Sequence, residues 1–182
     1  MIDQFFTIDR IYIGIDPGVS GGVAWKTTYE NMGLIGTSLQ KMPETERDLC
    51  DLFDKKILKD QYSDKAFAVI EQQTPRPTRY RDGKGGWKSS ILKSTCVLYS
   101  NYMQIRMCLI ALDIPFETVT PTKWQSYFGL KKKKGEGDNK WKNRIKAKAQ
   151  ELYPESMIDS GSLTLATSDS LLIATYCQDK KG

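Results

Sequence analysis

Histidine is absent from this chain and cysteine is scarce: 182 residues include no histidine and four cysteines, at positions 50, 96, 108 and 177. Without histidine, the chain can form no Ser-His or Cys-His nucleophile system. The cysteines are widely spaced and form no CxxC pair, which argues against a structural zinc site. Each lies in an apolar helical pattern, where a small buried thiol is the usual occupant, so we expect no disulfide. Any hydrolytic chemistry must therefore use carboxylates, lysines or a hard metal ion.

Long hydrophobic runs are also missing. No stretch of about eighteen apolar residues occurs, and residues 1–4 carry no basic region that leads into an apolar one. We therefore expect no membrane contact, no secretory signal, and a soluble intracellular protein. The length suits one domain, residues 1–182, with a sizeable core.

Positive charge is concentrated in two segments. Residues 120–150 hold ten Lys or Arg against two acids, and residues 76–93 hold six against one. Because the total charge is +5, the rest of the chain is acidic, with a net charge of −8. Two concentrated basic segments indicate a polyanionic partner, whereas the alternative is two solvated surface loops.

Two strand-length apolar runs each end in a carboxylate. Residues 12–15 lead into Asp16 and a Pro-Gly turn, which is followed by a second strand at 23–25, and residues 66–70 lead into Glu71. An acid at a strand end is well placed to bind a metal ion. The alternative for Asp16 alone is an ordinary hairpin in which it caps the turn.

The remaining periodicity predicts an α/β fold. We expect a third antiparallel strand at 34–39, a strand at 116–119, and helices at about 45–58, 91–112, 121–129 and 139–153, with a last helix that starts at 168. A strand, long helix, strand order indicates parallel strands joined to an antiparallel hairpin, flanked by helices. Asp169 shares a helix face with Leu172, Ile173 and Tyr176, so it points inward and needs a cation.

The two basic segments supply the expected nucleic-acid contacts. The loop at 72–87 combines cations that can contact phosphates with aromatics that can stack on bases; its candidates are Arg76, Arg79, Tyr80, Arg81, Lys84 and Trp87. The second segment contributes further cations, namely Lys123, Lys131, Lys132, Lys133, Lys134, Lys140 and Arg144.

Four segments carry a resemblance to a known family. In chain order they are IGIDPGVSG at 13–21, VIEQ at 69–72, DGK at 82–84 with GW at 86–87, and SDSLLIA at 168–174. They span nearly the whole chain and resemble the RuvC-type Holliday-junction resolvases of the RNase H-like superfamily, more closely the phage and chloroplast relatives. The resemblance implies an RNase H-like mixed sheet. It also implies the cytoplasm of a bacterial or phage-infected cell, with an organellar nucleoid as the alternative.

The resemblance also implies a catalytic site. It puts the family's metal-binding acids on Asp16, Glu71 and Asp169, and its active-site lysine on Lys142, with Lys140 as the alternative register. Carboxylates suit Mg²⁺ or Mn²⁺. Two such ions, about 4 Å apart, would activate a water and stabilise the departing 3′-oxygen, so that nicks in four-way or branched DNA carry a 5′-phosphate and a 3′-hydroxyl. The lysine would contact a phosphate or stabilise transition-state charge.

The chain departs from the family at two positions. A fourth metal-binding residue is expected three or four positions before Asp169, but these positions hold Ala166 and Leu165. Three explanations stay open. Another residue supplies the fourth ligand, or the chain is a natural divergent form with weakened catalysis, or an Asp was replaced to trap an uncleaved complex. The aromatic that follows the strand acid by three residues in bacterial RuvC is Thr74 here, which leaves Tyr80 and Trp87 as stacking candidates.

Resolving a four-way junction takes two symmetric nicks, so we expect a homodimer. The helix at 91–112 is the expected interface, because it is apolar on more than one face, at Leu98, Tyr99, Tyr102, Met103 and Ile105. Burial of both faces within one subunit is the alternative.

Two other functions fit parts of the sequence. A non-catalytic junction-binding protein would explain Ala166. A sugar-kinase or actin-like ATPase shares the phosphate-binding hairpin pattern at 16–21 but needs roughly twice this length, so we expect no nucleotide cofactor.

Overall fold

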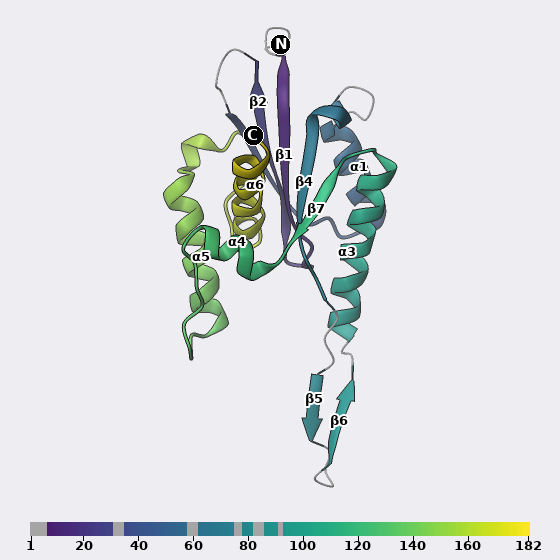
Figure 1. The fold of residues 1–182 in the computed structure, drawn as a ribbon, viewed down its shortest axis with the longest axis vertical. Helices are drawn as coiled ribbons and strands as arrows, with labels where there is room; N and C mark the ends of the chain where they lie inside the picture. Colours follow the sequence, from purple (N-terminus) through teal and green to yellow (C-terminus); the bar gives the residue numbers. More distant parts are fainter. Residues whose placement is uncertain (1–6, 31–34, 58–61, 75–77, 82–85, 91–92) are drawn as a thin grey trace.

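A five-stranded mixed sheet organises the chain in the computed structural model, which describes residues 7–30, 35–57, 62–74, 78–81, 86–90 and 93–182. The strand order is β3-β2-β1-β4-β7 (Figure 1). Strands β1 (Ile8–Asp16), β2 (Gly22–Tyr29) and β3 (Ile35–Lys41) form an antiparallel meander. Strands β4 (Ala66–Glu71) and β7 (Phe116–Val119) run parallel to β1. The predicted mixed sheet is confirmed.

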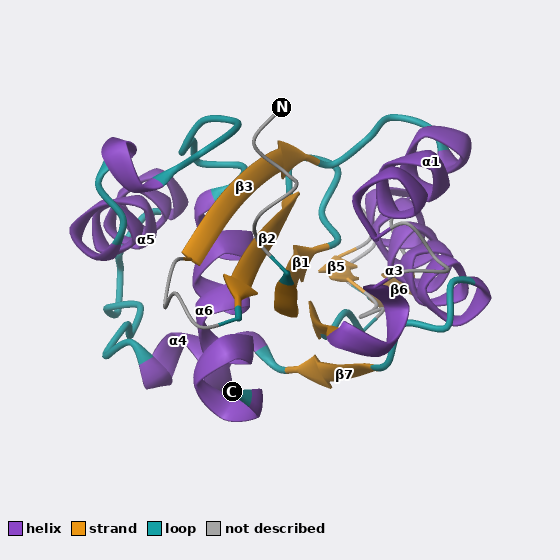
Figure 2. Ribbon diagram, turned by 90° about the horizontal axis from the view of Figure 1, so that it is seen from above, coloured by secondary structure: helices purple, strands orange, loops and turns teal. Residues whose placement is uncertain are grey.

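Side chains that point alternately to the two sides of each strand are buried on both faces of the sheet. Ile11, Ile13 and Ile15 of β1 pack in one apolar cluster, whereas Tyr12 belongs to a second cluster on the opposite face. Helices cover both faces: α1 and α3 lie on one side, and α4, α5 and α6 on the other (Figure 2). A central strand buried on both faces explains why β1 reads as a continuous apolar run.

The first face is covered by α1 (Glu46–Ile57) and α3 (Lys93–Ala111). Helix α1 begins at the predicted capping box, in which the Asp48 amide donates to Thr45 Oγ1 over 3.1 Å and Thr45 Oγ1 donates to Asp48 Oδ2 over 2.7 Å. The face of α3 toward the sheet buries Tyr102 and Ile105. Both residues were expected at a dimer interface and lie instead in the subunit core.

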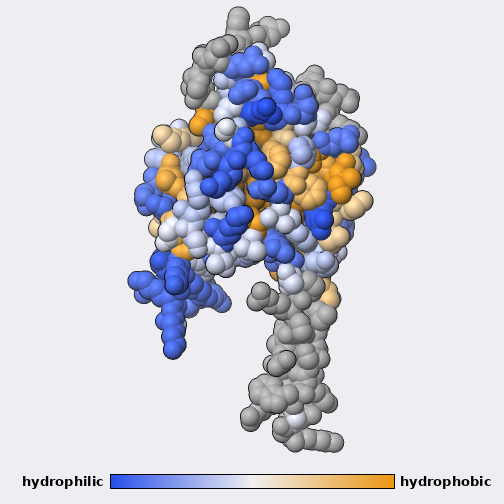
Figure 3. All heavy atoms as spheres, viewed as in Figure 1, coloured by the Kyte–Doolittle hydropathy of each residue, from blue (hydrophilic) through white to orange (hydrophobic). Residues whose placement is uncertain are grey.

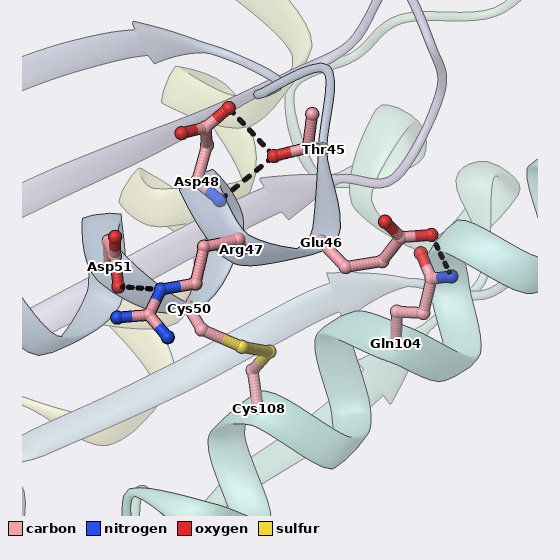
Figure 4. The surroundings of a disulfide bond; sticks show 8 residues. All are labelled: Thr45, Glu46, Arg47, Asp48, Cys50, Asp51, Gln104 and Cys108. Carbon is pink, nitrogen blue, oxygen red and sulfur yellow. Dashed lines mark hydrogen bonds and ion pairs between the residues drawn. A yellow bond between two sulfur atoms is a disulfide. The ribbon is translucent and has the colours of Figure 1, made fainter.

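A disulfide joins these two helices, so the prediction of no disulfide is wrong. The sulfur atoms of Cys50 and Cys108 are bonded, with their Cα atoms 5.8 Å apart (Figure 4). The helical pattern correctly predicts a buried Cys108, but it says nothing of which residue a neighbouring helix brings opposite. Of the other cysteines, Cys177 is buried as expected, whereas Cys96 is exposed.

Three helices cover the second face: α4 (Pro121–Tyr127), α5 (Asp138–Leu152) and α6 (Ser168–Lys181). Helix α6 is buried over ten consecutive residues, 168–177. It lies so close to β1 that a Cβ on Gly14 would stand 2.1 Å from the backbone nitrogen of Ala174. A glycine is therefore required at this contact. Short 3₁₀ turns at Ser63–Lys65 and Glu155–Met157 complete the helical elements of the described residues.

A two-stranded hairpin projects from the end of the sheet where β1 and β4 finish (Figure 1). Its strands are β5 (Thr78–Arg81) and β6 (Trp87–Ser90). We expected an irregular loop at 72–87, and this part of the prediction is wrong. Each strand has only four residues, and the prolines and glycines around them are typical of a loop. In the described residues, no helix is long and apolar enough to cross a membrane.

Candidate active site

Asp16 and Glu71 lie side by side at the carboxyl ends of two parallel strands. The last paired residues of β1 and β4 are Ile15 and Ile70, and each acid follows directly. Alternation puts Asp16 on the same face as Gly14, and Glu71 on the same face as Val69, which is the face covered by α6. The prediction that neighbouring strands present two acids at one edge of the core is confirmed.

The turn after β1 is shaped around Asp16. The amide of Gly18 donates to Asp16 Oδ1 over 3.1 Å. A Cβ on Gly21 would lie 2.2 Å from the Asp16 carbonyl oxygen and 2.9 Å from its Cγ, so only glycine leaves room for the carboxylate here. Asp16 therefore caps its turn, as it would in an ordinary hairpin. Unlike a usual turn cap, however, it is a buried carboxylate, with 8% exposure.

Asp169 joins the two strand acids from the first turn of α6. It is 5% exposed, and Lys142 of α5 donates to its Oδ2 over 2.6 Å. The predicted need for a cation is met from another helix, 27 positions away in sequence. Lys140, the alternative, is exposed, so Lys142 is the lysine that reaches the acids.

Glu71 is held through both carboxylate oxygens. Trp124 Nε1 donates to Oε2 over 2.8 Å, and Gln73 Nε2 donates to Oε1 over 3.0 Å. Trp124 belongs to α4 and is completely buried in the core. Neither partner is predicted by the sequence patterns. Two features could have indicated them: the indole N–H of Trp124, which needs a hydrogen-bond partner when it is buried, and the side-chain amide of Gln73, two residues after the acid.

The crowding of these acids raises two pKa values. Burial, followed by the charge of Asp169, raises the pKa of Asp16 to about 6, against the lowering effects of Lys142 and the Gly18 amide. Burial, followed by the charge of Asp16, raises the pKa of Glu71 to about 7. Burial lowers the pKa of Lys142, but Asp169 outweighs it, with help from Asp16 and Glu71, so the net direction is upward. The site therefore holds more negative charge than its one ammonium balances.

The acids do not converge on a single point in this arrangement. Within the described ranges, no three Asp, Glu or Cys side chains are grouped closely enough to hold one metal ion. The ammonium of Lys142 is the cation that pairs with Asp169. The expected metal ligands are thus neighbours, and one of them, Asp169, is bound to a lysine in this structure.

Ala166 lies in the turn before α6, next to the strand pair that carries Asp16. Its carbonyl oxygen would be 3.1 Å from a Cβ on Gly22, and Gly22 is the β2 residue paired with Asp16. Leu165 is 44% exposed. Position 166 is therefore close to the acids, but an alanine there supplies no ligand.

The second basic segment surrounds the start of α5. The side chains of Lys123, Lys131, Lys133, Lys134 and Lys140 are exposed. Hydrophilic atoms dominate the projection formed by this region, which extends from the same end of the molecule as the hairpin (Figures 1 and 3).

Two cations of this segment are engaged within the protein. Arg144 Nη1 is 2.9 Å from Glu136 Oε2 and also donates to the Lys131 carbonyl over 3.2 Å, so it fixes the loop. Lys132 pairs with Asp138 at the exposed N-terminus of α5. The expected role of Arg144 in DNA binding thus competes with a structural one.

The first basic segment maps to the hairpin. Arg79, Tyr80 and Arg81 belong to β5, and Trp87 begins β6, opposite Arg81. The positions of their side chains, and Arg76 and Lys84 altogether, lie outside the described residues. Their predicted DNA contacts stay predictions.

Comparison with known proteins finds similarity in fold. No protein-family model and no curated protein matches the sequence. RuvC of T. thermophilus in complex with a Holliday junction substrate matches with a TM-score of 0.50 and 9% identity, over 91% of this chain and 90% of that chain. A second Thermus thermophilus RuvC structure gives 0.43 and 12%, over 90% of each chain. The yeast mitochondrial Holliday junction resolvase Ydc2 gives 0.44 and 15%, over 95% and 79%.

At these identities the likeness concerns the fold alone. The mixed sheet flanked by helices is the RNase H-like fold that the sequence resemblance predicts. The closer likeness to phage and chloroplast relatives stays a prediction.

Proposed function

We propose that this protein is a metal-dependent endonuclease that nicks four-way junctions or other branched DNA and leaves 5′-phosphate and 3′-hydroxyl ends. The observation that carries the proposal is the cluster of Asp16, Glu71, Asp169 and Lys142 at one end of an RNase H-like sheet. The RuvC structure of the same fold contains a Holliday junction substrate, which supports branched DNA as the substrate class.

The donor set suits a hard divalent cation. Carboxylate oxygens are the preferred ligands of Mg²⁺ and Mn²⁺, and three clustered acids share one ammonium. Asp16, Glu71 and Asp169 would hold the metal if Lys142 moved aside and the three carboxylates closed on one ion, and two ions per site follow from the family resemblance. The bound metal would lower the pKa of an attacking water and stabilise charge on the departing oxygen.

The protein's own groups have separate tasks. Trp124 and Gln73 fix the orientation of Glu71 by holding both oxygens, and the Gly18 amide does the same for Asp16. Lys142 keeps 43% of its side chain exposed, so its ammonium can donate to a phosphate oxygen of bound DNA. There it would offset the negative charge that grows on the phosphate during cleavage.

The exposed lysines complete the substrate site. A row of cations beside the acids would neutralise DNA phosphates without reading sequence. Lys123 of α4 and the lysines at 131, 133, 134 and 140, which precede or begin α5, are exposed. The hairpin on the other side would supply the contacts of the first basic segment.

We propose that the active form is a homodimer built on α3. Its outer face keeps a stripe of apolar side chains exposed: Tyr99 (36%), Met103 (37%), Met107 (60%) and Ile110 (54%). Contiguous exposed apolar surface marks an interaction site. Two copies joined there would bring the two active sites that paired nicking needs. A sedimentation experiment that finds a monomer both free and on junction DNA would refute the dimer.

A junction-binding protein with weakened cleavage is the second candidate. It rests on Ala166, which lies beside Gly22, the β2 residue paired with Asp16, and whose side chain has no ligand atom. The cytoplasm of a bacterial or phage-infected cell is the proposed location for either form.

The product ends test the proposed chemistry. We expect a labelled four-way junction to be nicked in Mg²⁺ or Mn²⁺ and not in EDTA, and the nicks to be resealed by DNA ligase, which requires a 5′-phosphate and a 3′-hydroxyl. Ends that ligase cannot seal, or nicking that persists in EDTA, would contradict the mechanism. Tight junction binding without any nicking would favour the second candidate.

A further inference from the structure

A second cavity, of about 640 Å³, lies where β1 begins and α6 ends, whereas the acids of the candidate active site lie where β1 ends and α6 begins. Figure 1 shows the end of α6 on the opposite side of the molecule from the projecting hairpin. The volume falls within the range of about 300 to 1,000 Å³ that is typical of small-ligand sites. The polar part of the lining consists mainly of Asp9, Tyr12, Lys26, Tyr153, Gln178 and Asp179.

Lys26 is a buried cation in the wall of this cavity. It is 2% exposed, and its Nζ donates to the Tyr153 hydroxyl and lies 4.7 Å from the centre of the Tyr153 ring. Within the described ranges, Lys26 forms no ion pair with a carboxylate. An ammonium group has three N–H donors, so two are left for another acceptor. Because a buried charge without a counter-ion is costly, this position suits an anionic group of a ligand.

Tyr12 adds a buried hydroxyl beside the lysine. Tyr12 and Lys26 are direct partners across the β1–β2 pair, so their side chains lie side by side on one face of the sheet. Tyr12 is 5% exposed, and among the described residues its hydroxyl has no hydrogen-bond partner. Burial raises the pKa of Tyr12, so the hydroxyl keeps its proton and is able to donate. An ammonium and a hydroxyl with unused donors, next to each other, can hold a carboxylate or phosphate group.

Two exposed carboxylates line the same cavity and restrict which anions fit. Asp9 Oδ2 accepts from the Thr28 hydroxyl over 3.4 Å. Asp179 Oδ2 accepts from the Tyr127 hydroxyl over 2.9 Å. In the part of the chain that the structure describes, the other oxygen of each acid has no partner. These acids would repel a polyanion such as DNA. A small molecule that carries both an anionic and a cationic group would satisfy the lysine and the acids together.

We propose that this cavity binds a small zwitterion, whose carboxylate or phosphate group is held by Lys26 and Tyr12 and whose ammonium group is held by the two exposed acids. The buried end should supply most of the affinity, because charge-assisted hydrogen bonds are strongest away from water. The exposed acids contribute less and select for the cationic end. The proposal concerns a site separate from the candidate active site and does not depend on the nuclease function.

Calorimetric titration of the full chain tests the proposal with four probes. Glycine, β-alanine and γ-aminobutyrate differ in the distance between carboxylate and ammonium, and phosphoethanolamine carries a phosphate in place of the carboxylate. We expect at least one of these probes to bind at a single site and to raise the melting temperature. Acetate and methylamine each carry only one of the two groups, so they should bind at least about ten-fold more weakly than the best zwitterion.

Four variants assign the binding to the cavity. Lys26→Met keeps a similar side-chain length without the ammonium and should weaken binding of the best probe by at least about ten-fold. Tyr12→Phe removes only the hydroxyl and should weaken it by about two- to ten-fold. Asp179→Asn should weaken binding of the zwitterion but not that of acetate. Lys41→Met is the matched control, because Lys41 is exposed on β3 and lies outside the lining, and it should bind as the parent does.

Circular dichroism shows whether each variant is folded, and Tyr12→Phe decides alone should Lys26→Met fail to fold. Binding of none of the four probes, or binding that the folded variants at positions 12 and 26 leave unchanged, would overturn the proposal. Acetate that binds as tightly as the best zwitterion would overturn the choice of a zwitterion. Because the titrations contain no DNA, these outcomes leave the proposed nuclease function unaffected.

Discussion

Replacing Glu71 by glutamine should stabilise the metal-free protein at high pH. The pKa of Glu71 is raised from 4.5 to about 7, first by burial and then by the charge of Asp16. The folded state therefore penalises the ionised carboxylate. Below about pH 4.5 the acid is neutral in both folded and unfolded chains and causes no penalty. The penalty grows as pH rises toward 7 and is complete above it.

The pKa gives the size of the effect. Holding Glu71 ionised costs the folded state about 3 kcal/mol at pH 8, at about 1.4 kcal/mol for each pH unit between the two pKa values. Glutamine has the same shape and no charge. We expect Glu71→Gln to raise the free energy of unfolding by about 2 to 3 kcal/mol at pH 8 and to change it by less than about 1 kcal/mol at pH 4.5, where Glu71 is neutral in the folded state and only half ionised in the unfolded chain.

Urea unfolding in EDTA, followed by tryptophan fluorescence, measures this difference. With an m-value of about 2 kcal/mol/M, the midpoint should move up by roughly 1 M or more at pH 8. Glu151→Gln is the control, because its carboxylate is 65% exposed and pairs with Lys148, so it should shift stability by less than about 1 kcal/mol. An unchanged midpoint for Glu71→Gln at pH 8, or an equal gain at both pH values, would refute the claim that burial and neighbouring acids raise the pKa of Glu71.

Three further changes test other parts of the structure. Reduction of the Cys50–Cys108 disulfide, which closes a loop of 58 positions, should cost about 2 to 4 kcal/mol of stability in denaturant melts; no shift on adding dithiothreitol would contradict the covalent link, and in a reducing cytoplasm the pair is a dithiol. Neutralising the four lysines at 131–134 should weaken binding to duplex and junction alike and reduce the salt slope by up to about 0.9 per lost phosphate contact; an unchanged slope would exclude these contacts. Ala166→Asp should raise the nicking rate while leaving junction affinity nearly unchanged, and an unaltered rate would show that the fourth ligand, if one exists, lies elsewhere.

The sheet could be predicted because its signals are local. Residues 66–71 and 116–119 are strands with the predicted bounds, since short apolar runs between polar breaks have few alternatives. The last helix begins at Ser168 as expected, and Asp169 faces inward because its neighbours on that helix face are apolar. Leu152, by contrast, is 37% exposed although it keeps the helical spacing of the buried residues Trp141, Ile145 and Ala149, because the helix ends there.

The contacts that shape the site could not be predicted, because they join residues far apart in sequence. Trp124 is 53 positions from Glu71, and Lys142 is 27 from Asp169. Periodicity says which side of an element faces the core, but not which residue of another element lies opposite. The same limit explains the missed disulfide. It also explains why the register of Lys142 against Lys140 stayed open until the packing of α5 on α6 was known.

Nicking of one four-way junction by the parent protein and by Asp16→Asn tests the central claim most directly. Asp16 is buried at 8% exposure between the turn glycines and the other acids, and asparagine fits the same space without the charge. Under single-turnover conditions in Mn²⁺, the parent or its Ala166→Asp form should nick the junction and leave linear duplex of the same sequence intact, and Asp16→Asn should abolish nicking while junction binding persists. Nicking that survives in Asp16→Asn, or cleavage of linear duplex at the same rate, would contradict the account.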